Sequence, residues 1–136
     1  MKPQTKFTDR SDDNFQTRIL LVEDEAPIRL LMWHILNQAG YTVFLATDGV
    51  DGLRKLSEAG HIDLLITDLS MPGITGLQLA QHASEIVPDL KVIYASGSQD
   101  CFPETRADIQ CLKKPFAVEE LLQTVRAALD PDLCPR

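Results

Sequence analysis

The chain has 136 residues, of which 44% are hydrophobic and 24% charged, a length and composition that suit one globular domain. Its net charge of −7 argues against a nucleic-acid duplex as the main partner, because binding to the phosphate backbone requires a basic face. No segment is apolar enough for a signal peptide or a membrane span. The three cysteines are odd in number and lack metal-ligand spacing, so we expect free thiols and a cytoplasmic protein without membrane contact.

Changes in composition divide the chain into three parts. Residues 1–16 are polar, mixed in charge and without periodicity, so we expect a flexible N-terminal tail. Residues 17–130 carry alternating strand and helix patterns and are expected to form the domain. Residues 131–136 are expected to be a short C-terminal tail.

The domain begins with a strand and a helix. Residues 19–22 are a short apolar run, as expected for a strand that is buried on both faces. Asp24 and Pro27 then mark a helix start, and Gly40 marks its end. The apolar residues of this helix recur at helical spacing, at Ile28, Leu31, Met32, Ile35, Leu36 and Ala39.

The strand–helix unit then repeats along the chain, except in a poorly patterned stretch after residue 95. Alternating strands and helices predict a parallel sheet with helices on both faces. Right-handed crossovers favour a doubly wound, flavodoxin-like α/β fold with five strands in the order 2-1-3-4-5. The further strands are predicted at residues 41–46, 62–67, 90–95 and 109–113, and the further helices at 48–59, 75–86 and 118–129.

Polar residues follow four of the predicted strands. Glu23 and Asp24 follow the first strand, Asp68 the third, Ser96 the fourth and Lys114 the fifth. Open parallel sheets bind ligands beyond the carboxyl ends of their strands, so we expect these side chains to meet at one edge. Each residue alone is more often a cap or turn residue, and only their joint placement indicates a site.

The chemistry of this set suits phosphoryl transfer. Three neighbouring carboxylates repel one another, and a hard octahedral ion such as Mg²⁺ relieves the repulsion. One carboxylate can then attack a phosphoryl group to form an acyl phosphate. Lys114 can pair with the phosphoryl oxygens, and the Ser96 hydroxyl can donate a hydrogen bond to them.

From about residue 18 to residue 129 the chain resembles the receiver domain of bacterial response regulators. The resemblance rests on Leu-Val-Glu-Asp-Glu at 21–25, the segment 68–76, Ala-Ser-Gly at 95–97 and Lys-Pro-Phe at 114–116. These motifs occur in the family's order, which makes the set far more specific than any single motif.

The resemblance implies a phosphoacceptor and a metal site. Asp68 would accept the phosphoryl group. Asp24 and Asp68 would ligate Mg²⁺ directly, Glu23 would do so through water, and Ser70 would contribute its backbone carbonyl. The chain would catalyse only its own phosphorylation and dephosphorylation, so it is not expected to be an enzyme.

The resemblance also implies a switch, with two departures from the family. Lys114 would bind the phosphoryl group, with a cis peptide bond to Pro115, and Ser96 would move toward that group in the active state. However, Cys111 stands where the family has an aromatic residue. Only 17 residues lie between Ser96 and Lys114, and Pro103 interrupts them, so we expect a short or irregular fourth helix.

The expected partners are proteins. The phosphodonor would be a histidine kinase or a histidine phosphotransfer domain, docked in part through Leu30 and Trp33 on the outer side of the first helix. Output would pass by contact with a downstream protein that the sequence does not identify. Two alternatives stay open: a receiver-like scaffold without phosphorylation, which failure to bind Mg²⁺ would favour, and a flavodoxin-like cofactor-binding protein, which a bound nucleotide or yellow colour would favour.

Overall fold

The computed structural model describes residues 17–97 and 109–129 of the chain. The described elements lie within about two residues of the predicted ranges. The predicted tails and fourth helix lie outside the described residues. The strands are β1 (Arg18–Val22), β2 (Thr42–Ala46), β3 (Leu64–Asp68), β4 (Lys91–Ser96) and β5 (Ile109–Lys113), and the helices are α2 (Ala26–Gln38), α3 (Gly49–Ala59), α4 (Gly76–Ile86) and α5 (Val118–Leu129).

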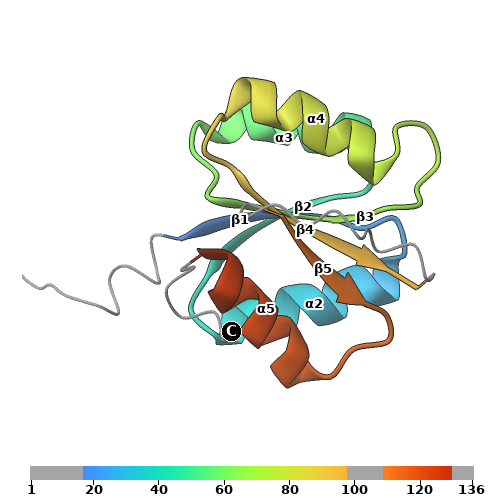
Figure 1. Ribbon diagram of the computed structural model, residues 1–136, viewed down its shortest axis with the longest axis vertical. Helices are drawn as coiled ribbons and strands as arrows, with labels where there is room; N and C mark the ends of the chain where they lie inside the picture. Colours follow the sequence, from blue (N-terminus) through green and yellow to red (C-terminus); the bar gives the residue numbers. More distant parts are fainter. Residues whose placement is uncertain (1–16, 98–108, 130–136) are drawn as a thin grey trace, which may run out of the picture.

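The strands form one parallel sheet in the order β2-β1-β3-β4-β5. Helices α3 and α4 cover one face of the sheet, and α2 and α5 cover the other (Figure 1). The predicted doubly wound, flavodoxin-like fold is therefore confirmed.

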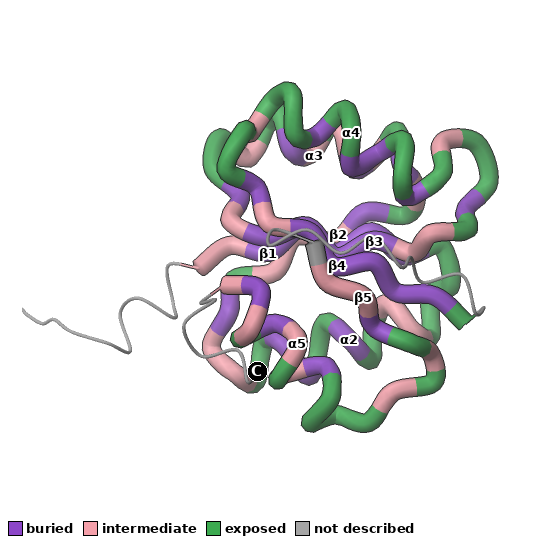
Figure 2. The backbone as a smooth tube through the Cα atoms, in the orientation of Figure 1, coloured by how far each residue is buried: buried purple, intermediate pink, exposed green. Residues whose placement is uncertain are grey.

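The sheet divides the hydrophobic core into two clusters. In β1, Ile19 and Leu21 pack with Met32 of α2 on one face, whereas Leu20 and Val22 pack with residues of α3 and α4 on the other. Successive side chains of a strand point to opposite faces, so a continuous apolar run buries both sides. Figure 2 shows the strands largely buried between helices whose outer surfaces are exposed. This packing fixes the strand ends that carry the polar residues.

Helix ends are fixed by local hydrogen bonds. The Asp48 side chain accepts from the backbone N–H of Asp51 at the start of α3. Thr75 and Gln78 form a capping box at the start of α4. Gly60 follows α3 with φ +84°, a conformation that favours glycine. None of the described helices is long and apolar enough to cross a membrane.

Helix α2 starts next to Asp24 with Pro27 in its first turn, as expected, but its apolar stripe differs from expectation. Its cap residue is Glu25, whose side chain makes no capping hydrogen bond. Leu31, expected in the apolar stripe, is 54% exposed, whereas Met32 and Ile35 are buried. The buried face of α2 is therefore narrower than the apolar face predicted from the sequence. The sequence pattern alone does not fix how a helix is rotated against a sheet, so it did not indicate that Leu31 would point outward.

The expectation of free thiols is wrong for Cys111. Cys111 lies in β5, opposite Tyr94 of β4 in the sheet register, and it is disulfide-bonded. The other two cysteines lie outside the described residues. The odd number of cysteines could not indicate which of them pair.

Candidate functional site

The predicted acidic residues meet at the carboxyl edge of the sheet. Glu23 directly follows β1 and Asp68 ends β3, and these strands are neighbours with Val22 opposite Thr67. Carboxylate oxygens of Glu23, Asp24 and Asp68 all lie within 4.8 Å of one another. Glu23 is almost fully buried, whereas Asp24 is exposed. The site therefore combines a buried carboxylate with one that solvent and ligands can reach.

Lys114 joins these acids from the end of β5. Its Nζ lies 2.7 Å from Oε1 of Glu23 and 3.3 Å from Oδ2 of Asp68. The backbone N–H of Lys114 donates to the carbonyl of Ser96 at 2.8 Å, which extends the pairing of β4 and β5. The Lys114–Pro115 peptide bond is cis, as expected. The lysine thus connects the end of β5 to the ends of β1 and β3.

Burial and charge act in opposite directions on the ionisable groups of the site. Burial raises the pKa of Glu23 above 4.5, although the hydrogen bond and the charge of Lys114 lower it. Burial also lowers the pKa of Lys114, but Glu23 and Asp68 outweigh this effect, and the net pKa lies above 10.5. Lys114 is therefore a firmly protonated cation at neutral pH.

Three further hydrogen bonds hold Glu23 in place. Its backbone N–H donates to Ala46 at 3.1 Å, and its Oε2 accepts from the N–H of Glu25 at 3.2 Å. Its carbonyl accepts from Nη1 of Arg29 at 2.7 Å. The contribution of Arg29 to the site was not predicted from the sequence. Arg29 lies in the first turn of α2, four residues after the cap residue Glu25, and this position could have indicated that its side chain reaches back to the loop.

The acid cluster suits a hard divalent cation. Carboxylate oxygens are the ligands that Mg²⁺ and similar ions prefer. Among the described residues, Asp24 has no hydrogen-bond or ion-pair partner, so its carboxylate is available for a metal. Lys114 contacts only one oxygen each of Glu23 and Asp68. The donor set therefore fits an oxygen-ligated cation beside the lysine.

The loop between β3 and α4 packs closely against the backbone of Asp68. The N–H of Gly76, the first residue of α4, donates to the carbonyl of Leu69 at 2.9 Å. A Cβ at Gly76 would lie 2.2 Å from the carbonyl oxygen of Asp68, so only glycine fits here. In the same loop, the N–H of Ser70 lies 3.4 Å from Oδ1 of Asp68. The predicted residue Ser70 is thus adjacent to the acid group.

Ser96 lies beside the acids at the end of β4. Ala95, its neighbour, stands opposite Asp68 in the sheet register. Ser96 is 3% exposed, so it belongs to the buried floor of the site. The structure therefore brings all the predicted site residues to one edge of the sheet, namely Glu23, Asp24, Asp68, Ser70, Ser96 and Lys114.

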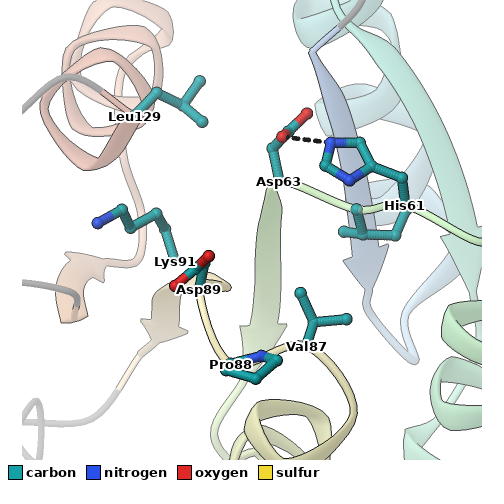
Figure 3. Close-up of a pocket in the computed structure, with 8 residues that line it drawn as sticks. His61, Asp63, Val87, Pro88, Asp89, Lys91 and Leu129 are labelled. Atoms are coloured by element: carbon teal, nitrogen blue, oxygen red, sulfur yellow. Dashed lines mark hydrogen bonds and ion pairs between the residues drawn. The ribbon is translucent and has the colours of Figure 1, made fainter.

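A separate pocket of about 260 Å³ lies at the opposite edge of the sheet (Figure 3). It adjoins the amino-terminal ends of β3 and β4, where His61 Nε2 and Asp63 Oδ1 are 2.7 Å apart. Asp63 Oδ2 also accepts from the N–H of Arg18 at 2.8 Å. Parallel sheets bind ligands at the carboxyl ends of their strands. We therefore assign the functional site to the edge that carries Glu23, Asp24 and Asp68 rather than to this pocket. The pocket is lined by His61, Ile62, Asp63, Val87, Pro88, Asp89, Lys91 and Leu129.

The fold and the site define a doubly wound parallel-sheet protein with three carboxylates and a lysine at its carboxyl edge. Residues 19–126 match the response regulator receiver domain family. The chain belongs to this family and is a receiver domain of the two-component type.

Named relatives support this assignment. The chain is 35% identical over 116 residues to the response regulator receiver protein CpdR of Brucella abortus (strain 2308), covering 82% of this chain and 96% of CpdR. It is 33% identical over 132 residues to the sensor kinase CckA of the same organism, covering 93% of this chain but 14% of CckA. The chain thus matches nearly all of one relative and a small part of another.

A solved structure shows the same architecture. The crystal structure of the response regulator protein TrrA from Thermotoga maritima, in complex with Mg²⁺–BeF, has a TM-score of 0.73 and 32% sequence identity to this chain. The alignment covers 84% of this chain and all of TrrA, 100%. The likeness therefore extends over a complete receiver fold.

Proposed function

We propose that Asp68 accepts a phosphoryl group from the phosphohistidine of a histidine kinase or a histidine phosphotransfer domain. A carboxylate oxygen of Asp68 attacks phosphorus, the O–P bond forms and the P–N bond breaks. The imidazole leaves with the bonding electron pair and is protonated on the leaving nitrogen. The product is an aspartyl phosphate, and no free substrate is turned over.

The observation that carries this proposal is the convergence of three carboxylates within 4.8 Å beside the Lys114 ammonium. Phosphoryl transfer depends chiefly on positioning and on stabilising charge, and this edge provides groups for both. Lys114 would bind a phosphoryl oxygen, and the Ser96 hydroxyl would donate to another.

The same edge would hold Mg²⁺. Asp24 and Asp68 would bind the ion directly, Glu23 would do so through water, and Ser70 would contribute its backbone carbonyl. The ion, when bound, supplies neutralisation of the acids and a contact to the incoming phosphoryl oxygens. The relative TrrA, whose crystal structure contains Mg²⁺–BeF, supports this proposal.

Intact mass spectrometry after incubation with acetyl phosphate tests the chemistry. Wild type with Mg²⁺ is expected to gain one phosphoryl group, which hydroxylamine releases because an acyl phosphate is labile to this nucleophile. Asp68→Asn, and wild type in EDTA, are expected to gain none. An adduct that persists in Asp68→Asn would assign the acceptor elsewhere. No adduct in wild type, even with a kinase as donor, would favour the scaffold alternative.

We also propose that the phosphodonor docks in part on the outer side of α2. Leu30 is 56% exposed and Trp33 36% exposed, and both project from the helix that directly follows Glu23 and Asp24. The Leu30→Ala, Trp33→Ala variant is expected to react normally with acetyl phosphate but slowly with its histidine donor. A normal rate with the protein donor would contradict this proposal.

The remaining assignments are also proposals. We propose that the receiver domain spans residues 17–130, that its output passes by contact with another protein, and that it acts in the cytoplasm. The family match over residues 19–126 supports the domain limits. Limited proteolysis tests those limits, and cell fractionation tests the location.

A further inference from the structure

One arginine links residues 23–25, the loop between β1 and α2, to helix α2. Nη1 of Arg29 donates to the carbonyl of Glu23 at 2.7 Å, and the backbone N–H of Arg29 donates to the carbonyl of Glu25 at 2.9 Å. Helical side chains lean toward the N-terminus of their helix, and Arg29 accordingly reaches back over the loop. We propose that Arg29 is a positioning residue that holds this loop in the shape in which Asp24 and Asp68 can bind one metal ion. This inference rests on the Mg²⁺-dependent function proposed above.

Besides the N–H of Glu25, which donates to Oε2 of Glu23 at 3.2 Å, the loop has few other supports. Glu25, the cap residue of α2, makes no side-chain capping bond, so the start of the helix is not fixed in that way. In the described part of the chain, Arg29 is the only donor to the Glu23 carbonyl. Glu23 is 1% exposed, so water could replace that donor only if the loop opened. Removal of the guanidinium would therefore release the backbone next to Asp24.

The Arg29 guanidinium holds the backbone of Glu23 without binding the carboxylates that would ligate the metal. Arg29 is half-buried and its guanidinium contacts the Glu23 backbone, yet no ion pair within 4.0 Å joins it to a carboxylate of the described residues. An arginine paired with Asp24 would compete with a cation for its oxygens. Donation to a carbonyl instead keeps Asp24 available, which is what a metal-binding loop requires. Partners of this kind orient metal ligands without touching the ion.

Isothermal titration of the purified, unphosphorylated chain with Mg²⁺ tests this inference. Arg29→Met keeps the aliphatic stem but removes the donor, and it is expected to weaken Mg²⁺ binding about 10-fold, within the range for outer-shell partners of metal sites. Arg29→Lys keeps a donor on a flexible stem and is expected to recover most of the affinity. Arg54→Met is the matched control, because among residues 17–97 and 109–129 the exposed Arg54 pairs only with Asp51 and Glu58 of its own helix, α3.

Two further readouts separate positioning from general destabilisation. Amide hydrogen exchange of the peptide containing residues 23–26 is expected to be faster in Arg29→Met, with the strands unchanged. At saturating Mg²⁺ its phosphorylation rate with acetyl phosphate is expected to return to the wild-type value. If Arg29→Met fails to fold, Arg29→Gln, whose amide is too short to reach the carbonyl, takes its place.

The outcomes distinguish this inference from the proposed function. Wild-type Mg²⁺ affinity in Arg29→Met, or in Arg29→Gln, overturns the role of Arg29 alone. Equal losses in Arg29→Lys and Arg29→Met also overturn it, because the donor would then not matter. Absence of Mg²⁺ binding by wild type overturns both the inference and the proposed metal site.

Discussion

The contact between Gly76 and Asp68 gives a sharp test of how the site is built. In Gly76→Ala, the new Cβ would lie 2.2 Å from the carbonyl oxygen of Asp68 and 2.9 Å from Cα of Leu69. An ordinary contact between carbon and oxygen is about 3.3 Å, so α4 and the end of β3 must separate by about 1 Å. Both neighbouring atoms belong to the backbone, and no side-chain rotation can relieve the clash.

Two effects of this substitution can be estimated. Overpacking of a rigid site costs about 3 kcal/mol of unfolding free energy, or about 10 °C in Tm for a domain of this size. A displacement of Asp68 by about 1 Å is expected to lower the phosphorylation rate about 100-fold. Urea denaturation followed by circular dichroism measures the first effect, and the acetyl phosphate reaction followed by intact mass measures the second.

Gly60→Ala is the matched control. A Cβ added at Gly60 would meet no atom within 4 Å, but the residue has φ +84° and ψ −43°, outside the left-handed helical region, so a backbone strain of about 2 kcal/mol without a steric clash is expected. Its phosphorylation rate should equal that of wild type, because Gly60 lies at the far end of α3. If Gly76→Ala is no less stable than Gly60→Ala and is phosphorylated at the wild-type rate, the close contact at Gly76 does not position Asp68.

Three further predictions address charge, the far edge of the sheet and the disulfide. Burial holds the pKa of Glu23 above 4.5, so the carboxyl group of Glu23 binds its proton more tightly in the folded state than in the unfolded state. The contribution of Glu23 to the free energy of unfolding therefore falls as the pH rises above 4.5. In EDTA, the stability of Glu23→Gln relative to wild type is therefore expected to rise with pH, and a pH-independent difference in denaturation midpoint would contradict this. Asp63→Ala removes the acceptor of the Arg18 N–H and the partner of His61, so it is expected to cost about 2 kcal/mol in urea denaturation with no change in phosphorylation rate. A slower rate would show that the two edges are coupled. Cys111 is expected to resist alkylation until a reductant is added, as peptide mass spectrometry would detect; labelling of the unreduced, folded protein would exclude the disulfide.

The sequence predicts the fold well because burial on both faces leaves a distinct pattern. Residues 19–22 are all apolar, and the structure places them in alternation against the two core clusters. The residues that directly follow a parallel strand share one edge, so Asp68 and Lys114 could be placed at one site from their positions at strand ends. Strand ends and residue types together were sufficient for this prediction.

Other features depend on geometry that a linear pattern does not contain. Glu23 and Asp24 are adjacent acids, yet one is buried and the other exposed, because the chain turns between β1 and α2. Lys114 lies closer to Glu23 than to Asp68, which depends on the path of the loop after β5. Arg29 reaches backward across a loop to a carbonyl group, and any residue type could have supplied that carbonyl.

The division of the core by the sheet has a consequence for how such a domain can diversify. Substitutions on opposite faces share no side-chain neighbours, so their effects on stability should add. Met32 anchors α2 from within, while Leu30 and Trp33 contribute little to the core. Substitutions on the outer surface of α2 should therefore leave the core cluster beneath α3 and α4 unchanged, so this surface can change its chemistry at little cost in stability.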